Sequence, residues 1–211
     1  MPMATTRDTM VTKRRALLIG ATGLTGGHLL QRLLSDRRYD AIHVLSRRPL
    51  AVREDRLHSH VVKFDDLPPE HTAFRVDDVY CCLGTTIRQA GSRGRLRQVD
   101  YDYPMMTARA ARAGGAATMV AMSALGADPG SGNFYLRTKG ELERDLQHLA
   151  FRRLVLVRPS LLIGRRQTKR LLEGAGMWLL PNLAFRMQGP LKPYRAIEAG
   201  LVARAMHHLA W

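Results

Sequence analysis

Cysteine is scarce in this chain. The two cysteines, Cys81 and Cys82, are adjacent in an apolar run, so they cannot form the disulfide framework of a small secreted protein. The opening residues also lack the apolar core of a secretory signal peptide. We therefore expect a frayed N-terminus over residues 1–14 and a protein of the reducing cytoplasm.

Long apolar runs are missing as well. None approaches the roughly 18 residues that a membrane-spanning helix needs, because Arg, Pro or Gly interrupts each candidate. We expect a soluble protein without a membrane span. The 211 residues, 45% of them hydrophobic, fit one globular domain, since single domains commonly run to roughly 250 residues. This length excludes a large separate substrate domain.

Acidic residues are few, with 18 against 33 Lys and Arg, which gives a net charge of +15. Residues 151–211 hold 11 basic and 2 acidic residues, a local surplus of +9. Such a surface attracts phosphorylated ligands, anionic membranes or nucleic acid, and charge alone does not choose among them. The four arginines of Arg88–Arg97 have no aromatic residues among them, so base stacking is not indicated. We expect a solvated loop or one that meets an anionic substrate, and no specific nucleic-acid partner.

Apolar runs rich in Val, Ile and Leu alternate with helix-length segments, which predicts an α/β fold with a doubly wound parallel sheet covered by helices on both faces. The expected strands are Ala16–Gly20, Ile42–Ser46, Val61–Phe64, Asp78–Leu83, Thr118–Ser123 and Leu154–Arg158. The expected helices are Gly26–Ser35, Asp100–Ala113, Tyr135–Leu149 and Ala196–Leu209. The irregular Gly164–Pro193 segment, with its apolar insert, is expected to form a flap over the substrate. The eight histidines show no metal-ligand spacing, so we expect no metal.

A glycine-rich turn follows the first expected strand and opens the first helix. In dinucleotide-binding folds the first glycine of such a loop permits a tight turn, the second lets the backbone approach a pyrophosphate, and the third lets helix pack on strand. The N–H groups of the helix N-terminus then face the anion. The expected contacts of the cofactor here are Gly20, Thr22, Gly23, Leu24, Thr25 and Gly26.

The second expected strand ends in Ser46-Arg47-Arg48, about 20 residues beyond the glycine loop. An NAD-binding protein usually places an acidic residue there to hold the ribose hydroxyls, whereas guanidinium groups suit a 2′-phosphate. Arg47 and Arg48 therefore favour NADP(H) over NAD(H). Asp65, after the third expected strand, is placed to reach the adenine, although a turn aspartate would look the same.

Tyr135 and Lys139 are four residues apart on an expected helix, and Ser123 ends the preceding strand. Residues at i and i+4 share one helix face. A Tyr phenol can donate a proton to a carbonyl oxygen if a nearby ammonium lowers its pKa, and a Ser hydroxyl can hold the same oxygen. These three residues predict carbonyl reduction or the reverse oxidation of an alcohol.

The sequence resembles short-chain dehydrogenases/reductases, and more closely the oxidoreductase family of the human Tat-interacting protein and its bacterial relatives. Beyond the glycine loop, the resemblance is carried from about Arg15 to the C-terminus by Cys81-Cys82-Leu-Gly-Thr-Thr86, Ala90-Gly-Ser92, Val99-Asp-Tyr-Asp-Tyr103, Gly126-Ala-Asp128, Phe134-Tyr-Leu-Arg-Thr-Lys-Gly-Glu141 and Arg158-Pro-Ser-Leu-Leu162.

The resemblance implies one Rossmann domain over residues 1–211 that binds NADP(H), with residues 160–211 forming a small substrate-side and C-terminal helical part. Ser123, Tyr135 and Lys139 take the family's catalytic roles, and Lys139 also holds the ribose. The other implied cofactor contacts are Leu83, Gly84, Thr85, Thr86, Pro159, Ser160 and Leu161. Characterised reductases often add an Asn on the helix after the fourth strand, and the segment Asp100–Ala113 has none.

Two functions follow as hypotheses. The first is an NADP(H)-dependent oxidoreductase acting on a small carbonyl compound or alcohol, as a monomer or homodimer. The alternative is an NADP(H)-binding regulatory or redox-sensing scaffold with little turnover, since members of the resembled family are associated with regulatory partners.

Overall fold

The computed structural model describes residues 13–163 and 195–211. The expected flap, and the expected frayed start up to residue 12, lie outside the described residues. Residue 14 is not frayed, because the first strand begins there.

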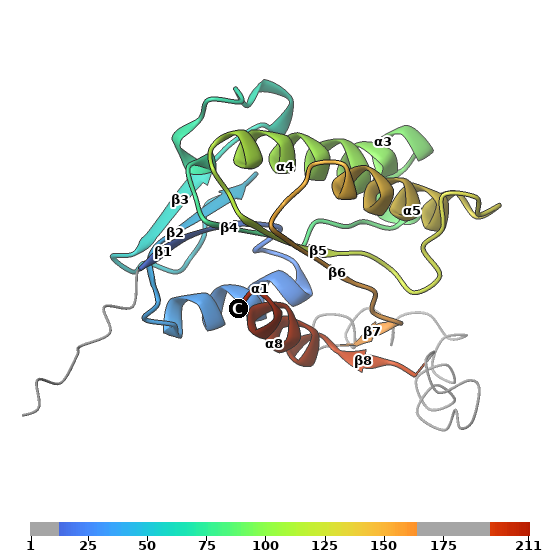
Figure 1. Cartoon of the computed structure of the whole chain (residues 1–211). Helices are drawn as coiled ribbons and strands as arrows, with labels where there is room; N and C mark the ends of the chain where they lie inside the picture. Colours follow the sequence, from blue (N-terminus) through green and yellow to red (C-terminus); the bar gives the residue numbers. More distant parts are fainter. Residues whose placement is uncertain (1–12, 164–194) are drawn as a thin grey trace, which may run out of the picture.

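Six parallel strands form the central sheet, in the order β3-β2-β1-β4-β5-β6. This is the strand order of a Rossmann fold, with the order reversing between β1 and β4. The predicted fold class is therefore confirmed (Figure 1). The strands are β1 (Arg14–Ile19), β2 (Tyr39–Ser46), β3 (Leu57–Val61), β4 (Asp78–Cys81), β5 (Thr118–Met122) and β6 (Arg153–Val157).

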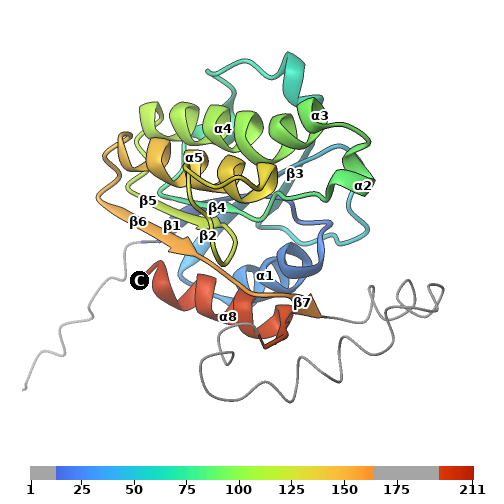
Figure 2. The same ribbon diagram turned by 90° about the vertical axis from the view of Figure 1, so that its right-hand side faces the viewer.

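Helices cover both faces of this sheet. The helices α1 (Leu24–Ser35) and α8 (Ala199–Leu209) lie together on one face, and α4 (Tyr103–Ala113) and α5 (Phe134–Gln147) lie on the other (Figure 2). The connections add short helices α2 (Ile87–Ala90) and α3 (Arg93–Arg97), and a second, two-stranded sheet of β7 (Leu162–Ile163) and β8 (Ile197–Glu198). In the part of the chain that the structure describes, no helix has the length and apolar character to cross a bilayer.

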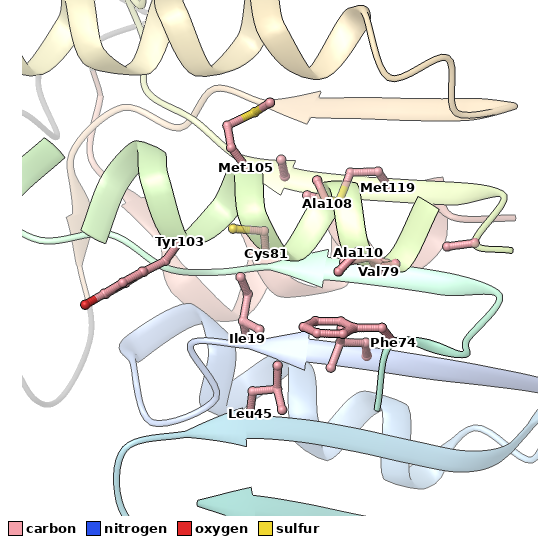
Figure 3. Close-up of a cluster of buried hydrophobic side chains, with 14 of the residues drawn as sticks. Ile19, Leu45, Phe74, Val79, Cys81, Tyr103, Met105, Ala108, Ala110 and Met119 are labelled. Carbon is pink, nitrogen blue, oxygen red and sulfur yellow. The ribbon is translucent and has the colours of Figure 1, made fainter. Parts of the chain in front are cut away.

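Two apolar cores lie back to back across the sheet, because side chains of a strand alternate between its faces. Leu17 and Ile19 of β1 belong to the core under α4 and α5, whereas Ala16 and Leu18 belong to the core over α1 and α8. This explains why the central strands read as continuous apolar runs. Figure 3 shows the first core, which contains Ile19, Leu45, Phe74, Val79, Cys81, Met105, Ala108 and Met119.

The first strand starts two residues before its expected beginning at Ala16. Arg14 forms an ion pair with the fully buried Asp78 of β4 and donates to the Thr118 hydroxyl at 3.2 Å. Asp78 also accepts a 2.8 Å hydrogen bond from the Tyr39 hydroxyl. An arginine is a poor strand former by pattern alone, and its partner lies 64 residues away, so local sequence did not indicate this start.

The third strand was expected at Val61–Phe64 and is found at Leu57–Val61. Its polar composition concealed it, since it is an edge strand beside β2 with little of its surface buried. His58 and His60 of β3 stack on His43 of β2, with ring centroids 5.0 Å and 5.4 Å apart. His71 lies edge-on against His60, so four of the eight histidines form one cluster.

The expected helix Asp100–Ala113 consists of two parts. A π-helical turn spans Gln98–Asp102, and the α-helix α4 follows from Tyr103. The π turn buries Asp100 completely. Single π turns inside helices occur frequently at functional sites.

Candidate active site

The site lies where the carboxyl ends of β1, β4 and β5 meet, next to the reversal of strand order, which is where open α/β sheets bind ligands. Gly20 follows β1 directly, Leu83 is the second residue after β4, and Ser123 follows β5 directly. The sequence places chemically useful residues after each of these strands, and parallel pairing brings their ends to one edge.

The glycine loop fits tightly against the segment that follows β4. Gly20 has a φ of +86°, and a Cβ there would lie 2.5 Å from the Cys82 carbonyl carbon. A Cβ at Gly26 would lie 2.1 Å from the Gly20 carbonyl oxygen. Gly20 and Gly26 are therefore required by packing, whereas a Cβ at Gly23 would meet only the Gly20 oxygen, at 3.1 Å.

The N-terminus of α1 carries features that suit an anion. No side chain caps the helix at Gly23, so its first N–H groups keep their hydrogen-bonding capacity. Thr25 is 2% exposed, and its hydroxyl has no hydrogen-bond partner among the described residues. A buried hydroxyl without a partner is costly, and a bound pyrophosphate would supply the missing acceptor. The residues present here thus fit a dinucleotide.

Arg47 and Arg48 lie at the same edge of the sheet, because β2 pairs with β1 up to Leu45 and Ile19. Both arginines are exposed, as a 2′-phosphate ligand at this position would require. Asp65 lies in a short 3₁₀ turn and accepts hydrogen bonds from Gln98 at 2.6 Å and from the Tyr103 hydroxyl at 2.9 Å. Its carboxylate therefore already holds the start of α4 in place.

A cavity of about 920 Å³ opens beside the carboxyl ends of β4 and β5. It brings together all three expected catalytic residues and seven of the expected cofactor contacts, namely Ser123, Tyr135, Lys139, Leu83, Gly84, Thr85, Thr86, Pro159, Ser160 and Leu161. The glycine loop, Arg47, Arg48 and Asp65 do not line it. They lie outside the cavity, with Gly20 in contact with Leu83.

Ser123 continues β5 by one residue, since its N–H donates to the Val157 carbonyl at 2.7 Å. The side chain is 4% exposed and lines the cavity, and its hydroxyl has no partner among the described residues. Such a hydroxyl is free to bind an oxygen that enters the cavity. The strand thus fixes the position of the hydroxyl without using its hydrogen-bonding capacity.

Tyr135 and Lys139 lie on the first turns of α5. Asn133 caps this helix, because its side-chain oxygen accepts from the N–H groups of Tyr135 at 2.9 Å and Leu136 at 3.2 Å. A Cβ at Gly140 would lie 2.2 Å from the backbone of Asp128, so the helix packs directly on the preceding loop. The Asn133 cap and the close packing at Gly140 together fix the backbone that carries Tyr135 and Lys139.

Sequence reasoning missed Asp100 as a site residue. One of its carboxylate oxygens lies 2.9 Å from the Lys139 ammonium, and the other accepts a 2.9 Å hydrogen bond from the Thr85 N–H. Both charged side chains are almost fully buried, with Lys139 1% exposed.

Electrostatics keep Tyr135 protonated and Lys139 charged. Burial raises the pKa of Tyr135 above its usual value, and the nearby Lys139 ammonium opposes this rise. The pKa of Lys139 is raised, because the attraction of Asp100 and Tyr135 outweighs the cost of its burial. Lys139 thus acts on the Tyr135 pKa in the expected direction, but burial outweighs it. Tyr135 is in the form that can donate a proton.

Other lining residues were also missed. Phe134 and Arg93 line the cavity, and the Arg93 guanidinium lies 5.5 Å from the Phe134 ring. Arg93 and Lys139 are the charged side chains of the described lining. Within residues 13–163 and 195–211, no three His, Cys, Asp or Glu side chains are arranged to hold a metal ion.

Solved structures with a similar fold include complexes with NAD and with UDP-linked sugars. MoeE5 in complex with UDP-glucose and NAD has a TM-score of 0.67 at 16% identity, covering 93% of this chain and 71% of that one. The UDP-N-acetylglucosamine 4-epimerase of Methanobrevibacter ruminantium, in complex with UDP-N-acetylmuramic acid, has a TM-score of 0.69 at 15% identity, covering 94% and 73%. At these identities the likeness shows the fold alone, that of short-chain dehydrogenases and epimerases.

Sequence relatives define the family. Protein HTATIP2 of Rattus norvegicus is 34% identical over 203 residues, which is 94% of this chain and 82% of the relative. Protein FMP52, mitochondrial, of Coccidioides immitis is 33% identical over 202 residues, 89% of this chain and 82% of that protein. No family model matches the sequence. The chain belongs to the HTATIP2 family of atypical short-chain dehydrogenases/reductases, as the sequence motifs indicated.

The names of the fungal relatives correct one expectation. Several of them, including the proteins of Debaryomyces hansenii and Candida glabrata, are named mitochondrial. The expected cytoplasmic location is therefore wrong by this comparison. The cysteine argument excluded dependence on disulfides, and it cannot separate one reducing compartment from another.

Proposed function

We propose that this protein is an NADP(H)-dependent oxidoreductase that interconverts a small carbonyl compound and its alcohol. The observation that carries the proposal is the buried hydroxyl of Ser123, which has no partner in the described part of the chain and lines the same cavity as Tyr135 and Lys139. Carbonyl reduction needs such a group beside a proton donor. The NAD complexes of proteins with this fold support a nicotinamide dinucleotide as the cofactor.

The dinucleotide would lie along the carboxyl edge of the sheet. The N-terminus of α1 and the Thr25 hydroxyl would hold the pyrophosphate, and the segment after β4 would lie beside the ribose and nicotinamide. The exposed Arg47 and Arg48 would bind a 2′-phosphate through charge-assisted hydrogen bonds. When bound, the nicotinamide supplies or accepts the hydride.

The side chains of the cavity would handle the oxygen and its proton. Ser123 would donate a hydrogen bond to the substrate carbonyl and orient it. Tyr135, protonated in the described state, would donate its proton to the same oxygen as negative charge develops there. The Lys139 ammonium would stabilise the tyrosinate that remains, and on the other side it would hold the ribose.

The regulatory alternative has one observation in its favour. Asp100 is fully buried and Lys139 is 1% exposed, so this pair offers no exposed path by which a proton could return to Tyr135. Proton resupply would have to come through the cavity itself. A protein that binds NADP(H) with little turnover would show the same arrangement.

Substitution of the proton donor tests the proposal. Tyr135→Phe should leave NADPH affinity nearly intact and lower carbonyl reduction by a factor on the order of 100 or more. Lys139→Met should weaken both, because its ammonium serves ribose and phenol. A matched control is Tyr101→Phe, whose hydroxyl bonds Asp145 at 2.5 Å outside the cavity. A panel of small aldehydes, ketones and quinones, followed by NADPH absorbance, would supply the substrate.

Two outcomes would count against the proposal, the first against its mechanism and the second against its enzymatic activity. Reduction by Tyr135→Phe at the unmodified rate would contradict the assigned mechanism. Tight NADPH binding without turnover across the whole panel would favour the regulatory alternative.

A further inference from the structure

A fully buried carboxylate, that of Asp100, lies beside the expected catalytic lysine. Asp100 comes from the π turn before α4, and Lys139 comes from the second turn of α5. The Lys139 ammonium lies 2.9 Å from an Asp100 carboxylate oxygen, which makes the contact a buried ion pair. The opposite charge of Asp100 favours the protonated form of Lys139.

The segment that follows β4 also holds Asp100 in place. Its second oxygen accepts from the Thr85 N–H at 2.9 Å, and Thr85 belongs to the cavity wall after β4. A Cβ at Gly84 would lie 3.5 Å from the first oxygen, so the wall also packs closely on the carboxylate. The position of Asp100 is thus set by the same segment that borders the expected cofactor site.

The Lys139 ammonium contacts two groups of the protein. Besides Asp100, its ammonium contacts the Met122 carbonyl at 3.4 Å. Lys139 also lines the cavity. The titratable groups that act on Lys139 are Asp100 from the π turn, Tyr135 from its own helix and Cys81 from β4.

We propose that Asp100 is a positioning residue, a fixed counter-ion that holds the Lys139 ammonium charged against the cavity and sets the pH range over which the Tyr135–Lys139 pair keeps both protons. The inference rests on the proposed function, because Lys139 matters in this way only beside a proton-donating Tyr135. Asp100 touches neither substrate nor cofactor in this role. It acts through Lys139.

Neutralising the Asp100 carboxylate should change the titration of the Tyr135–Lys139 pair in a defined direction. A negative charge at this distance favours the protonated form of both partners. Removing it makes the first proton leave the pair more easily, whichever residue releases it, since the two groups titrate as a coupled pair. Asp100→Asn keeps an acceptor for the Thr85 N–H and removes only the charge.

The test is an NMR titration with ¹³C labels on lysine Cε and tyrosine Cζ. Signals are assigned by their loss in Lys139→Met and Tyr135→Phe. In Asp100→Asn, the lower of the two midpoints should fall by about one pH unit or more. A matched control is Glu143→Gln. It neutralises a buried carboxylate on α5, which is paired with Arg158 and not with Lys139. That variant should leave both midpoints in place.

The titration requires no substrate, so it separates this inference from the proposed function. An unchanged midpoint in folded Asp100→Asn would overturn the role of Asp100, even if the protein proves to be an active reductase. A shifted midpoint in a protein that never turns over would support Asp100 and count against the enzyme. Once a substrate is found, the alkaline limb of kcat/KM for reduction should move down by the same amount.

A second measurement covers the case in which Asp100→Asn does not fold. Lys139→Met leaves the Asp100 charge buried without its partner, which is strongly unfavourable. If Asp100 is the counter-ion of Lys139, adding Asp100→Asn to Lys139→Met should raise the melting temperature above that of the single variant. A double variant that melts at or below the temperature of Lys139→Met would overturn the proposal.

Discussion

The Nδ1 atom of His43 lies 3.1 Å from the Nε2 atom of His60, joining β2 to the edge strand β3 by an imidazole pair. One nitrogen donates the proton of this contact and the other must accept it, so the accepting ring is neutral. A proton on the accepting nitrogen would remove the acceptor and break the bond. Its stability must depend on pH.

Acid should weaken the fold through this cluster. Burial, with the neighbouring charges of His58, His60 and Arg15, lowers the pKa of His43 from 6.5 to about 4. Between these values the unfolded chain binds a proton that the folded protein does not, so the free energy of unfolding falls as the pH drops through this window. At pH 5 the loss is at most about 2 kcal/mol. Urea unfolding at pH 7.5 and pH 5 measures it.

Substitution isolates the contribution of His43. In His43→Thr, which retains strand propensity, the stability difference between the two pH values should shrink by on the order of 1 to 2 kcal/mol. His208→Gln, an exposed residue of α8, should leave the difference unchanged. The assignment fails if the two variants respond equally.

The preference for NADPH over NADH should depend on Arg47 and Arg48. Replacing both by Ala should remove most of it, since a charge-assisted contact with phosphate is typically worth about 1.5 to 3 kcal/mol. The control Arg37→Ala/Arg109→Ala removes the same charge from exposed positions elsewhere. Calorimetry with both nucleotides gives the comparison. Equal affinities in the unmodified protein would rule out this role.

The glycines of the loop should separate into structural and ligand-facing positions. Gly26→Ala should cost about 3 kcal/mol or prevent folding, because its Cβ has no space beside the Gly20 oxygen. Gly27→Ala should be tolerated, since its Cβ would lie 3.6 Å from the Ala21 oxygen. Gly23→Ala should fold with a modest loss and bind nucleotide weakly. Thermal unfolding and nucleotide titration of the three variants distinguish these effects, and equal stability of all three would contradict the packing argument.

Polyanions should bind weakly and without sequence preference. The local surplus of +9 in residues 151–211 favours a counterion-release interaction that fades between low and physiological salt. Fluorescence anisotropy with two unrelated DNA duplexes, each over a salt series, would measure this. A tight complex with one duplex at physiological salt would be evidence for a cognate nucleic acid.

The sequence predicted the central sheet because its strands are apolar on both faces, as β1 and β5 show. It could not place β3, an edge strand in which His58, Ser59 and His60 interrupt the apolar run. The expected Ser123, Tyr135 and Lys139 do line one cavity, since strand ends and helix spacing are local properties. Asp100 was missed because its position depends on a π turn and its ion pair is with a lysine 39 positions away in the chain.

The alternation that separates the two cores also separates the two thiols. Cys81 faces the core under α4 and α5, whereas Cys82 faces the other core, with its sulfur 3.9 Å from that of Met206 on α8. Burial raises the pKa of Cys81 to about 11 and that of Cys82 further, so neither reacts readily while the layers are closed. Two neighbouring residues thus provide natural reporters of different motions. The alkylation rate of Cys81 would follow the opening of one helical layer, and that of Cys82 the opening of the other, without any introduced label.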